Sequence, residues 1–310
     1  MVSVELLKAH QTYYRGDTQG WQQEARLLQS LWRQARGLPP RGDGDHDGSY
    51  LPGSEVEEKT GAAYISQDAV AALKSALKDK EPGAVLQEKR LWCNLLSSQP
   101  LCFNLFGSLS EHVDDPRTTQ ALRAVWPDIS RVTRIRYEHS PGRRGPGQYL
   151  GNRTAFDVCI DYLDDAGAER FLGIEVKYHE DLSGKAPEIR AEALDVFRTS
   201  PSFAPTAEKA LTTGRTAQLL LDHLLALSIN ARGERHGRFV ILLPDGNSSV
   251  RKHVAQYQEH LTADDGSFQP LTIEEFVSAL RTVLDEPWLD EIQTRYLDTA
   301  AIHRLEPFSG

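Results

Sequence analysis

Apolar residues recur at intervals of three and four positions in the first part of the chain. At this spacing Trp21, Ala25, Leu28 and Trp32 share one side of a helix, and the pattern stops at residues 37–40, Gly-Leu-Pro-Pro. The same spacing predicts helices over residues 66–80, 85–96 and 117–125. The first 125 residues are therefore predicted to be mainly helical.

After residue 130, apolar residues alternate with polar ones instead of recurring every three or four positions. Strands are predicted over residues 131–137, 156–162 and 171–178, the last two joined as a hairpin by the turn at residues 164–167. A helix that is apolar almost all round follows at 215–229, then an apolar strand at 239–243 and helices at 249–261 and 272–284. This order predicts an α/β fold, a mixed β-sheet flanked by helices on both faces.

Composition narrows the class of protein. The chain has 310 residues, 40% hydrophobic and 25% charged, which excludes a disordered or fibrous protein. The net charge of −9 argues against a surface that coats nucleic acid everywhere. The three cysteines form no CxxC pair, and no secretory signal or membrane span is recognisable. We expect a cytoplasmic protein that makes no membrane contact.

One acidic loop has the beginning of a calcium-binding pattern. Asp43, Asp45, Asp47 and Gly48 match the first positions of an EF-hand loop, but Ser54 stands where the twelfth position needs a glutamate. A flexible acidic loop is the preferred interpretation, and calcium binding is the alternative.

The predicted hairpin places charged side chains together. Side chains alternate along a strand, so Glu175 and Lys177 face one side, and the turn brings Asp157 opposite a residue close to Val176. Two carboxylates and an ammonium group would then meet on a mainly apolar hairpin. Burying two like charges together costs free energy unless another group compensates them. A divalent metal ion provides this compensation, with Lys177 placed to orient or deprotonate a water molecule. A cross-strand salt bridge on a solvated face is the alternative.

Asp157, followed after the hairpin by Glu175-Val176-Lys177, resembles the PD-(D/E)XK nuclease superfamily and its restriction-endonuclease-like fold. The resemblance covers about residues 85–261, between a helical N-terminal extension (1–84) and a C-terminal helical extension (262–310). It implies that Asp157 and Glu175 bind Mg²⁺ or Mn²⁺ and that Lys177 positions the attacking water. Phe156 replaces the proline of the family motif.

The resemblance also suggests two helical residues for the site. Members of the superfamily place a glutamate on the helix before the first core strand, and Glu88 matches by location, with Glu81 and Glu111 as rivals. Some place a glutamine on the helix after the ExK strand, and Gln218 matches there. With Arg215 and Asp222 it forms a polar stripe on the apolar helix. The alternatives are a surface glutamate and an ordinary hydrogen bond between helices.

A run of arginines precedes Asp157. Residues 131–153 contain six arginines and one acid, Glu138. Arg143, Arg144 and Arg153 are the candidates for DNA contact, because arginine binds phosphate without reading sequence. A solvated loop is the alternative for each of them.

These features predict a Mg²⁺-dependent nuclease, most simply a DNA endonuclease of the restriction, defence or repair type, with a homodimer as one possibility. A non-catalytic member of the fold that binds nucleic acid or protein is the alternative. An unrelated metal-dependent hydrolase finds no HExxH, GxSxG or Walker motif to support it.

Overall fold

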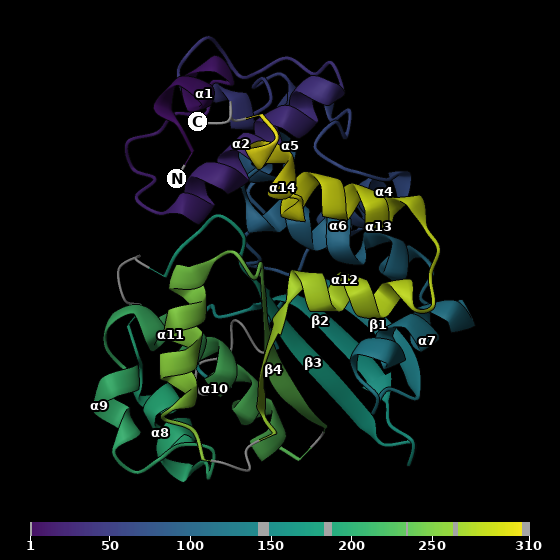
Figure 1. The fold of residues 1–310 in the computed structure, drawn as a ribbon. Helices are drawn as coiled ribbons and strands as arrows, with labels where there is room; N and C mark the ends of the chain where they lie inside the picture. Colours follow the sequence, from purple (N-terminus) through teal and green to yellow (C-terminus); the bar gives the residue numbers. More distant parts are fainter. Residues whose placement is uncertain (1, 142–148, 183–187, 234, 263–265, 306–310) are drawn as a thin grey trace.

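A five-stranded mixed sheet forms the centre of the computed structural model, which describes residues 2–141, 149–182, 188–233, 235–262 and 266–305 (Figure 1). The strands lie in chain order: β1 (Arg131–His139), β2 (Phe156–Leu163), β3 (Glu169–Val176), β4 (His236–Leu243) and β5 (Phe268–Thr272). β1, β2 and β3 are antiparallel neighbours, whereas β4 runs parallel to β3 and β5 parallel to β4.

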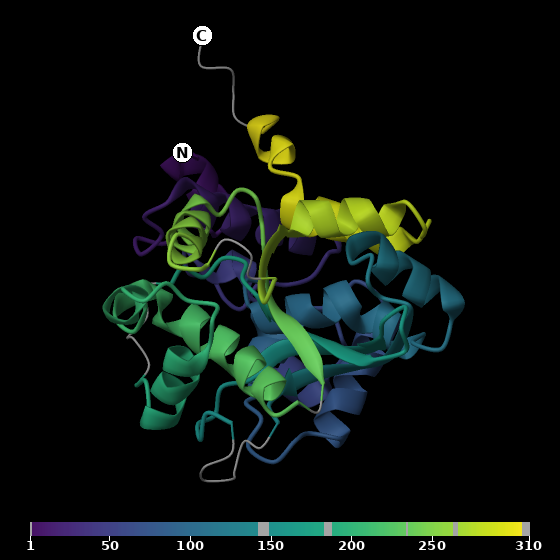
Figure 2. The ribbon, with the colours of Figure 1, turned by 90° about the horizontal axis from the view of Figure 1, so that it is seen from below.

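Helices cover both faces of this sheet, and Figure 2 shows the two groups with the sheet between them. On one face, α6 (Ser98–Glu111), α7 (Pro116–Val125), α12 (Ile273–Arg281) and α13 (Pro287–Ile292) pack on Val158, Ile160 and Ile174. On the other, α8 (Ala191–Thr199), α10 (Ala217–Ala231) and α11 (Ser248–Gln258) pack on Phe171, Phe239 and Ile241. The predicted α/β fold with a mixed sheet and flanking helices is confirmed.

Most of the remaining helices belong to the N-terminal part of the sequence, as the colours of Figure 1 show. The remaining helices are α1 (Val4–Ala9), α2 (Gly20–Ala35), α3 (Glu55–Glu58), α4 (Gln67–Lys78), α5 (Glu88–Cys93), α9 (Ala207–Leu211), the π-helix Gln293–Leu297 and α14 (Ala300–His303), with single 3₁₀ turns at Asp47–Ser49 and Gly214–Thr216. In the part of the chain that the structure describes, no helix is long and apolar enough to cross a membrane.

Helix α6 and strand β5 are among the elements that were not predicted from the sequence. Helix α6 buries residues on all its sides, among them Leu101, Phe103 and Phe106, so its apolar residues show no one-sided period. Strand β5 is short and contains Pro270, which is tolerated because β5 lies at the edge of the sheet. Since β5 comes from beyond residue 261, the sheet extends past the predicted nuclease core, and the division at residues 84 and 261 stays a prediction.

The acidic loop does not have the arrangement of a calcium loop. Asp47 accepts a hydrogen bond from the Gly44 backbone N–H at 3.0 Å and pairs with Arg41 at 2.5 Å. Its carboxylate therefore already has partners within the loop, and the choice between a flexible acidic loop and calcium binding stays a prediction.

Asp128, between α7 and β1, accepts hydrogen bonds from side chains on two strands of the sheet. Arg238 on β4 donates two hydrogen bonds to its carboxylate, at 2.8 and 2.9 Å, and the Tyr162 hydroxyl on β2 donates a third at 2.5 Å. Burial alone would raise the pKa of Asp128, but these contacts outweigh it and lower the pKa to about 2.

An Asp128→Asn variant should lose stability in a way that depends on pH. The folded-state pKa lies below the ordinary value of 3.8. The contribution of the Asp128 carboxylate to the free energy of unfolding is therefore present above pH 3.8 and is lost as the pH falls through about 2. At pH 7 we expect about 1–2 kcal/mol less stability in urea unfolding, because charge-assisted hydrogen bonds are lost at a partly exposed site. A difference from wild type that does not shrink between pH 6 and pH 3 would contradict this assignment.

Candidate active site

Three carboxylates stand in one row across the three antiparallel strands. Tyr137 pairs with Val158 and His139 with Phe156, so Glu138 of β1 lies opposite Asp157 of β2. Val158 pairs with Ile174, and one further step in the same register places Asp157 opposite Glu175 of β3. Opposite residues of neighbouring strands share a face of the sheet, and all three side chains line one cavity.

The hairpin residues make the contacts that bring the predicted site together. Lys177 Nζ donates to Glu175 Oε1 at 2.6 Å, and Gln218 Nε2 donates to the same oxygen at 3.0 Å from helix α10. Asp157 Oδ2 accepts the backbone N–H of Val176 at 2.8 Å. The structure thus brings four of the predicted residues together: Lys177 and Gln218 contact the Glu175 carboxylate, and Asp157 lies on the neighbouring strand. Their roles in catalysis stay predictions.

Phe156 has a packing role beside this cluster. Its ring lies over Gly173, where a Cβ atom would come within 2.4 Å of the ring carbons. Phe156 lies on β2, next to Asp157, and Gly173 lies on β3, two residues before Glu175. The aromatic residue at the family's proline position is therefore accommodated by a glycine on the neighbouring strand.

The cavity has a volume of about 610 Å³ and brings acids and arginines together. Its walls include Asp157, Glu175 and Gln218, and also Glu138 and Asp222, which the sequence did not single out as acids of the site. Arg153, Arg190 and Arg215 line it as well. This combination of acids and arginines suits a phosphate ester, because the arginines attract the anion and the acids can hold a cation.

Burial makes two carboxyl groups of this cavity, those of Asp157 and Asp222, hard to ionise. It raises the pKa of Asp157 well above its usual value, and the negative charges of Glu175 and Glu138 raise it further. Burial, followed by the charge of Glu175, also raises the pKa of Asp222. For Lys177, burial alone would lower the pKa, but Glu175 and Asp157 outweigh it and raise the pKa, so the ammonium form persists at neutral pH.

Other predicted site residues lie apart from this cluster or outside the described residues. Glu88 does not line the cavity: its side chain is 52% exposed and lies 3.7 Å from Lys59. Helix α5 is short and carries Glu88 at its exposed beginning, which is why location along the chain misled the prediction. The rival Glu81 contacts His139 and the Ser140 N–H. Arg143 and Arg144 lie outside the described residues.

Comparison with known proteins now adds to the geometry. The sequence profile described as the PD-(D/E)XK nuclease superfamily matches residues 15–298. The chain belongs to the PD-(D/E)XK nuclease superfamily. The match includes α2 and α13 as well as the sheet, so it extends well beyond the predicted core on both sides. No curated protein and no solved structure matches the chain.

Nucleases of this superfamily typically use divalent metal ions, and the donors present here fit such an ion. Among the described residues, no three His, Cys, Asp or Glu side chains converge as they would around a bound metal. Mg²⁺ needs only one or two carboxylates besides water and substrate oxygens, and Asp157 and Glu175 supply these as oxygen-only donors. The negative charges of Glu175 and Glu138 that act on Asp157 are the feature that a divalent cation would compensate.

Glu138 and Asp222 are two cavity acids that sequence reasoning missed as site residues. Glu138 was visible as the single acid of the arginine-rich segment, but its place opposite Asp157 depends on the register of β1. It also has a positive φ of 50°, an uncommon conformation for a non-glycine residue. Asp222 was visible as part of a polar stripe, but only the packing of α10 shows that it lines this cavity.

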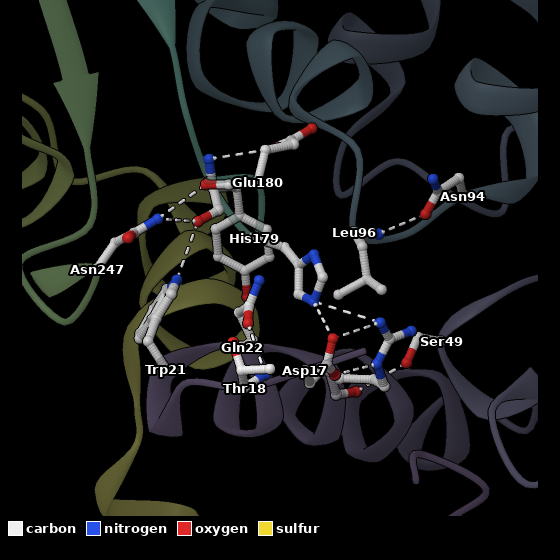
Figure 3. Close-up of polar contacts among 12 residues, drawn as sticks. Asp17, Thr18, Trp21, Gln22, Ser49, Asn94, Leu96, His179, Glu180 and Asn247 are labelled. Carbon is white, nitrogen blue, oxygen red and sulfur yellow. Dashed lines mark hydrogen bonds and ion pairs between the residues drawn. The ribbon is translucent and has the colours of Figure 1, made fainter. Parts of the chain in front are cut away.

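The segment that follows Lys177 is fixed from two sides, as Figure 3 shows. Trp21 Nε1 of α2 and Asn247 Nδ2 each donate to the Tyr178 carbonyl oxygen at 2.9 Å. Gln29, also on α2, donates to the Tyr178 hydroxyl at 3.0 Å. The fully buried Tyr178 therefore anchors the strand end that carries Lys177.

Asp17 reinforces the same contact between α2 and the end of β3 (Figure 3). Its carboxylate accepts two hydrogen bonds from Arg26, at 2.6 and 3.0 Å, and lies 3.2 Å from His179 Nε2. Asp17 and Arg26 are both buried, so the pair is shielded from solvent. Helix α2 is thus linked by hydrogen bonds to the residues that follow Lys177 in the sequence.

A Trp21→Phe variant tests whether this anchoring supports the site. Phenylalanine keeps most of the ring but removes the N–H donor, and we expect about 1 kcal/mol less stability together with a lower kcat and a nearly unchanged KM. Trp32→Phe is the matched control, because Trp32 on the same helix donates to Glu291 at 3.2 Å, away from Tyr178. Equal kinetic losses in the two variants would show that the anchoring has no specific effect on the site.

Proposed function

We propose that this chain is a divalent-cation-dependent nuclease that hydrolyses phosphodiester bonds in DNA. The observation that carries the proposal is the contact of Lys177 and Gln218 with one oxygen of Glu175, with Asp157 on the neighbouring strand and arginines on the wall of the same cavity. Asp157 and Glu175 would hold Mg²⁺ or Mn²⁺. When bound, this ion supplies positive charge beside the reacting phosphate.

The residues of the chain have separate parts in this proposal. Lys177, as an ammonium group, donates hydrogen bonds and can hold a water molecule or the charge that develops on the phosphate. Its raised pKa makes it a poor proton acceptor, so we assign it orientation rather than proton removal. Gln218 fixes the Glu175 carboxylate from the helix side, since its amide donates to the same oxygen as Lys177 does.

Arg153, Arg190 and Arg215 are proposed to attract the phosphate backbone. They line the cavity that contains the acids, and Arg190 donates to the Gly151 carbonyl oxygen at 2.5 Å, which fixes one end of the wall. Arginine contacts with phosphate supply affinity that does not depend on base sequence. DNA is the proposed substrate, and a homodimer that cuts both strands stays a prediction.

The proposal is tested with a panel of nucleic acids. Purified protein is incubated with circular duplex DNA, linear duplex DNA, single-stranded DNA and RNA, each with Mg²⁺, Mn²⁺ or EDTA. We expect cleavage of DNA that requires the cation, and cutting of the circle would identify an endonuclease. Cation-dependent cleavage of RNA alone would reassign the substrate. Binding of DNA without cleavage in either cation would favour the non-catalytic alternative.

A further inference from the structure

Asp222 is a buried carboxyl group without a visible partner for one of its oxygens. Only 4% of the residue is exposed, and Asp222 Oδ2 has no hydrogen-bond partner among the described residues. A buried polar atom is normally paired, because losing water without a replacement costs free energy. Asp222 lines the cavity, and its unpaired oxygen therefore points to a ligand that the described part of the protein chain does not supply.

The position of Asp222 connects it to the proposed cation site. It follows Gln218 by four residues on α10, so the two side chains lie on the same side of the helix. Gln218 contacts Glu175 at 3.0 Å, and both Gln218 and Asp222 line the cavity that contains Asp157. The charges that act on Asp222 are those of Glu175, Lys177, Asp157 and Glu138, all groups of this site.

We infer that Asp222 is a further ligand of the divalent cation that Asp157 and Glu175 hold. This inference rests on the proposed function, and it gives helix α10 a direct part in cation binding. Carboxylate oxygens are the donors that Mg²⁺ and Mn²⁺ prefer, and an octahedral ion has room for another carboxylate beside water and substrate. Among the described residues these acids do not already converge as they would around a bound ion, so the inference includes a movement of the Asp222 side chain toward the ion when it binds.

Direct measurement of Mn²⁺ binding tests the inference without reference to cleavage. Free Mn²⁺ is titrated by electron paramagnetic resonance against metal-free wild type, Asp222→Asn and the matched control Glu188→Gln. Glu188 is an exposed acid of the same cavity wall, so its variant removes the same charge without removing the proposed ligand. We expect Asp222→Asn to weaken Mn²⁺ binding by about tenfold or more, and Glu188→Gln to change it by less than about twofold.

A second variant reports ligation by its spectrum. Asp222→Cys places a thiolate donor at the same position, and Cd²⁺ bound by that sulfur should give an ultraviolet charge-transfer band. The three native cysteines are all buried, and wild type with Cd²⁺ provides their background. A new band in the variant supports ligation even if Asp222→Asn folds poorly.

The outcomes distinguish a failure of the proposed cation site from a failure of the role of Asp222 alone. If wild type binds Mn²⁺ and Asp157→Asn does not, the proposed cation site stands. Equal Mn²⁺ affinity in Asp222→Asn and Glu188→Gln, with no Cd²⁺ band in Asp222→Cys, then overturns the role of Asp222 alone. If wild type and Asp157→Asn bind Mn²⁺ equally weakly, the proposed cation site fails, and the role of Asp222 fails with it.

Discussion

Replacing Lys177 with methionine should lower the rate of DNA cleavage by about 10²–10³-fold without weakening cation binding. The ammonium group contacts Glu175 at 2.6 Å and is the positive side chain in direct contact with that carboxylate. Its loss removes a charged donor that stabilises the transition state, so kcat should fall more than KM rises. Mn²⁺ affinity should stay equal or increase, because the cation no longer competes with the ammonium for Glu175.

The same variant should be less stable in the absence of a cation. Lys177 and Glu175 are 8% and 5% exposed, and removing one member of a buried pair costs about 3–5 kcal/mol because the other charge is left unpaired. Saturating Mg²⁺ should restore much of this loss. Lys59→Met is the control, since Lys59 lies 3.7 Å from Glu88 at the exposed surface, and it should change stability by less than about 1 kcal/mol. Cleavage by Lys177→Met at the wild-type rate would remove Lys177 from the proposed site.

Asp157→Asn should abolish cleavage while leaving the metal-free protein as stable as wild type or more stable. The amide oxygen of asparagine can still accept the Val176 N–H, which Asp157 accepts at 2.8 Å. The substitution removes a carboxyl charge that Glu175 and Glu138 oppose, so a gain of about 1–2 kcal/mol is expected. Cleavage should fall by about 10³-fold or more, because the proposed cation loses one of its two main ligands.

The pH dependence of stability gives this variant an independent readout. The pKa of Asp157 is raised in the folded protein, so the folded state binds its proton more tightly than the unfolded state does. Metal-free wild type should therefore lose stability as the pH rises above the ordinary carboxyl range. Urea unfolding between pH 5 and pH 8 should show a smaller decline in Asp157→Asn, with the remaining decline coming from Asp222. A steeper decline in the variant would contradict the assigned direction.

The hairpin was predictable because local rules determine it. Alternation of side chains and a short turn place Glu175 and Lys177 on one side. The register puts Asp157 opposite Glu175, in agreement with the expected residue close to Val176. Gln218 was suggested by the resemblance to the PD-(D/E)XK nucleases, some of which place a glutamine on the helix after the ExK strand, and this chain has Gln218 at that location on α10.

The rest of the site depends on contacts that no local pattern records. Glu138 joins the row only because β1 pairs with β2 in one particular register. Glu88 shows the opposite case: a helix before the first core strand was expected to reach the site, but α5 presents this side chain to solvent. Strand β5 has only five residues, and all but the first are partly buried. No alternation of buried and exposed positions was therefore available to identify it.

The anchoring of Tyr178 is likewise a product of long-range packing. Trp21 and Gln29 are separated from Tyr178 by about half of the chain, and their amphipathic helix pattern says only that one side of α2 is buried. What that side covers is the strand end beside Lys177 (Figure 3). The helical N-terminal region is thus in contact with the candidate site, which its sequence pattern alone did not show.

The central claim is tested most directly by the cleavage rate of end-labelled and circular duplex DNA under single-turnover conditions, with wild type and Asp157→Asn prepared in parallel. The account predicts cleavage by wild type in Mg²⁺, none in EDTA, and a rate about 10³-fold or more lower for the variant. Cleavage that is equal in the two proteins, or that persists in EDTA, would contradict the claim that Asp157 and a divalent cation act together at this site.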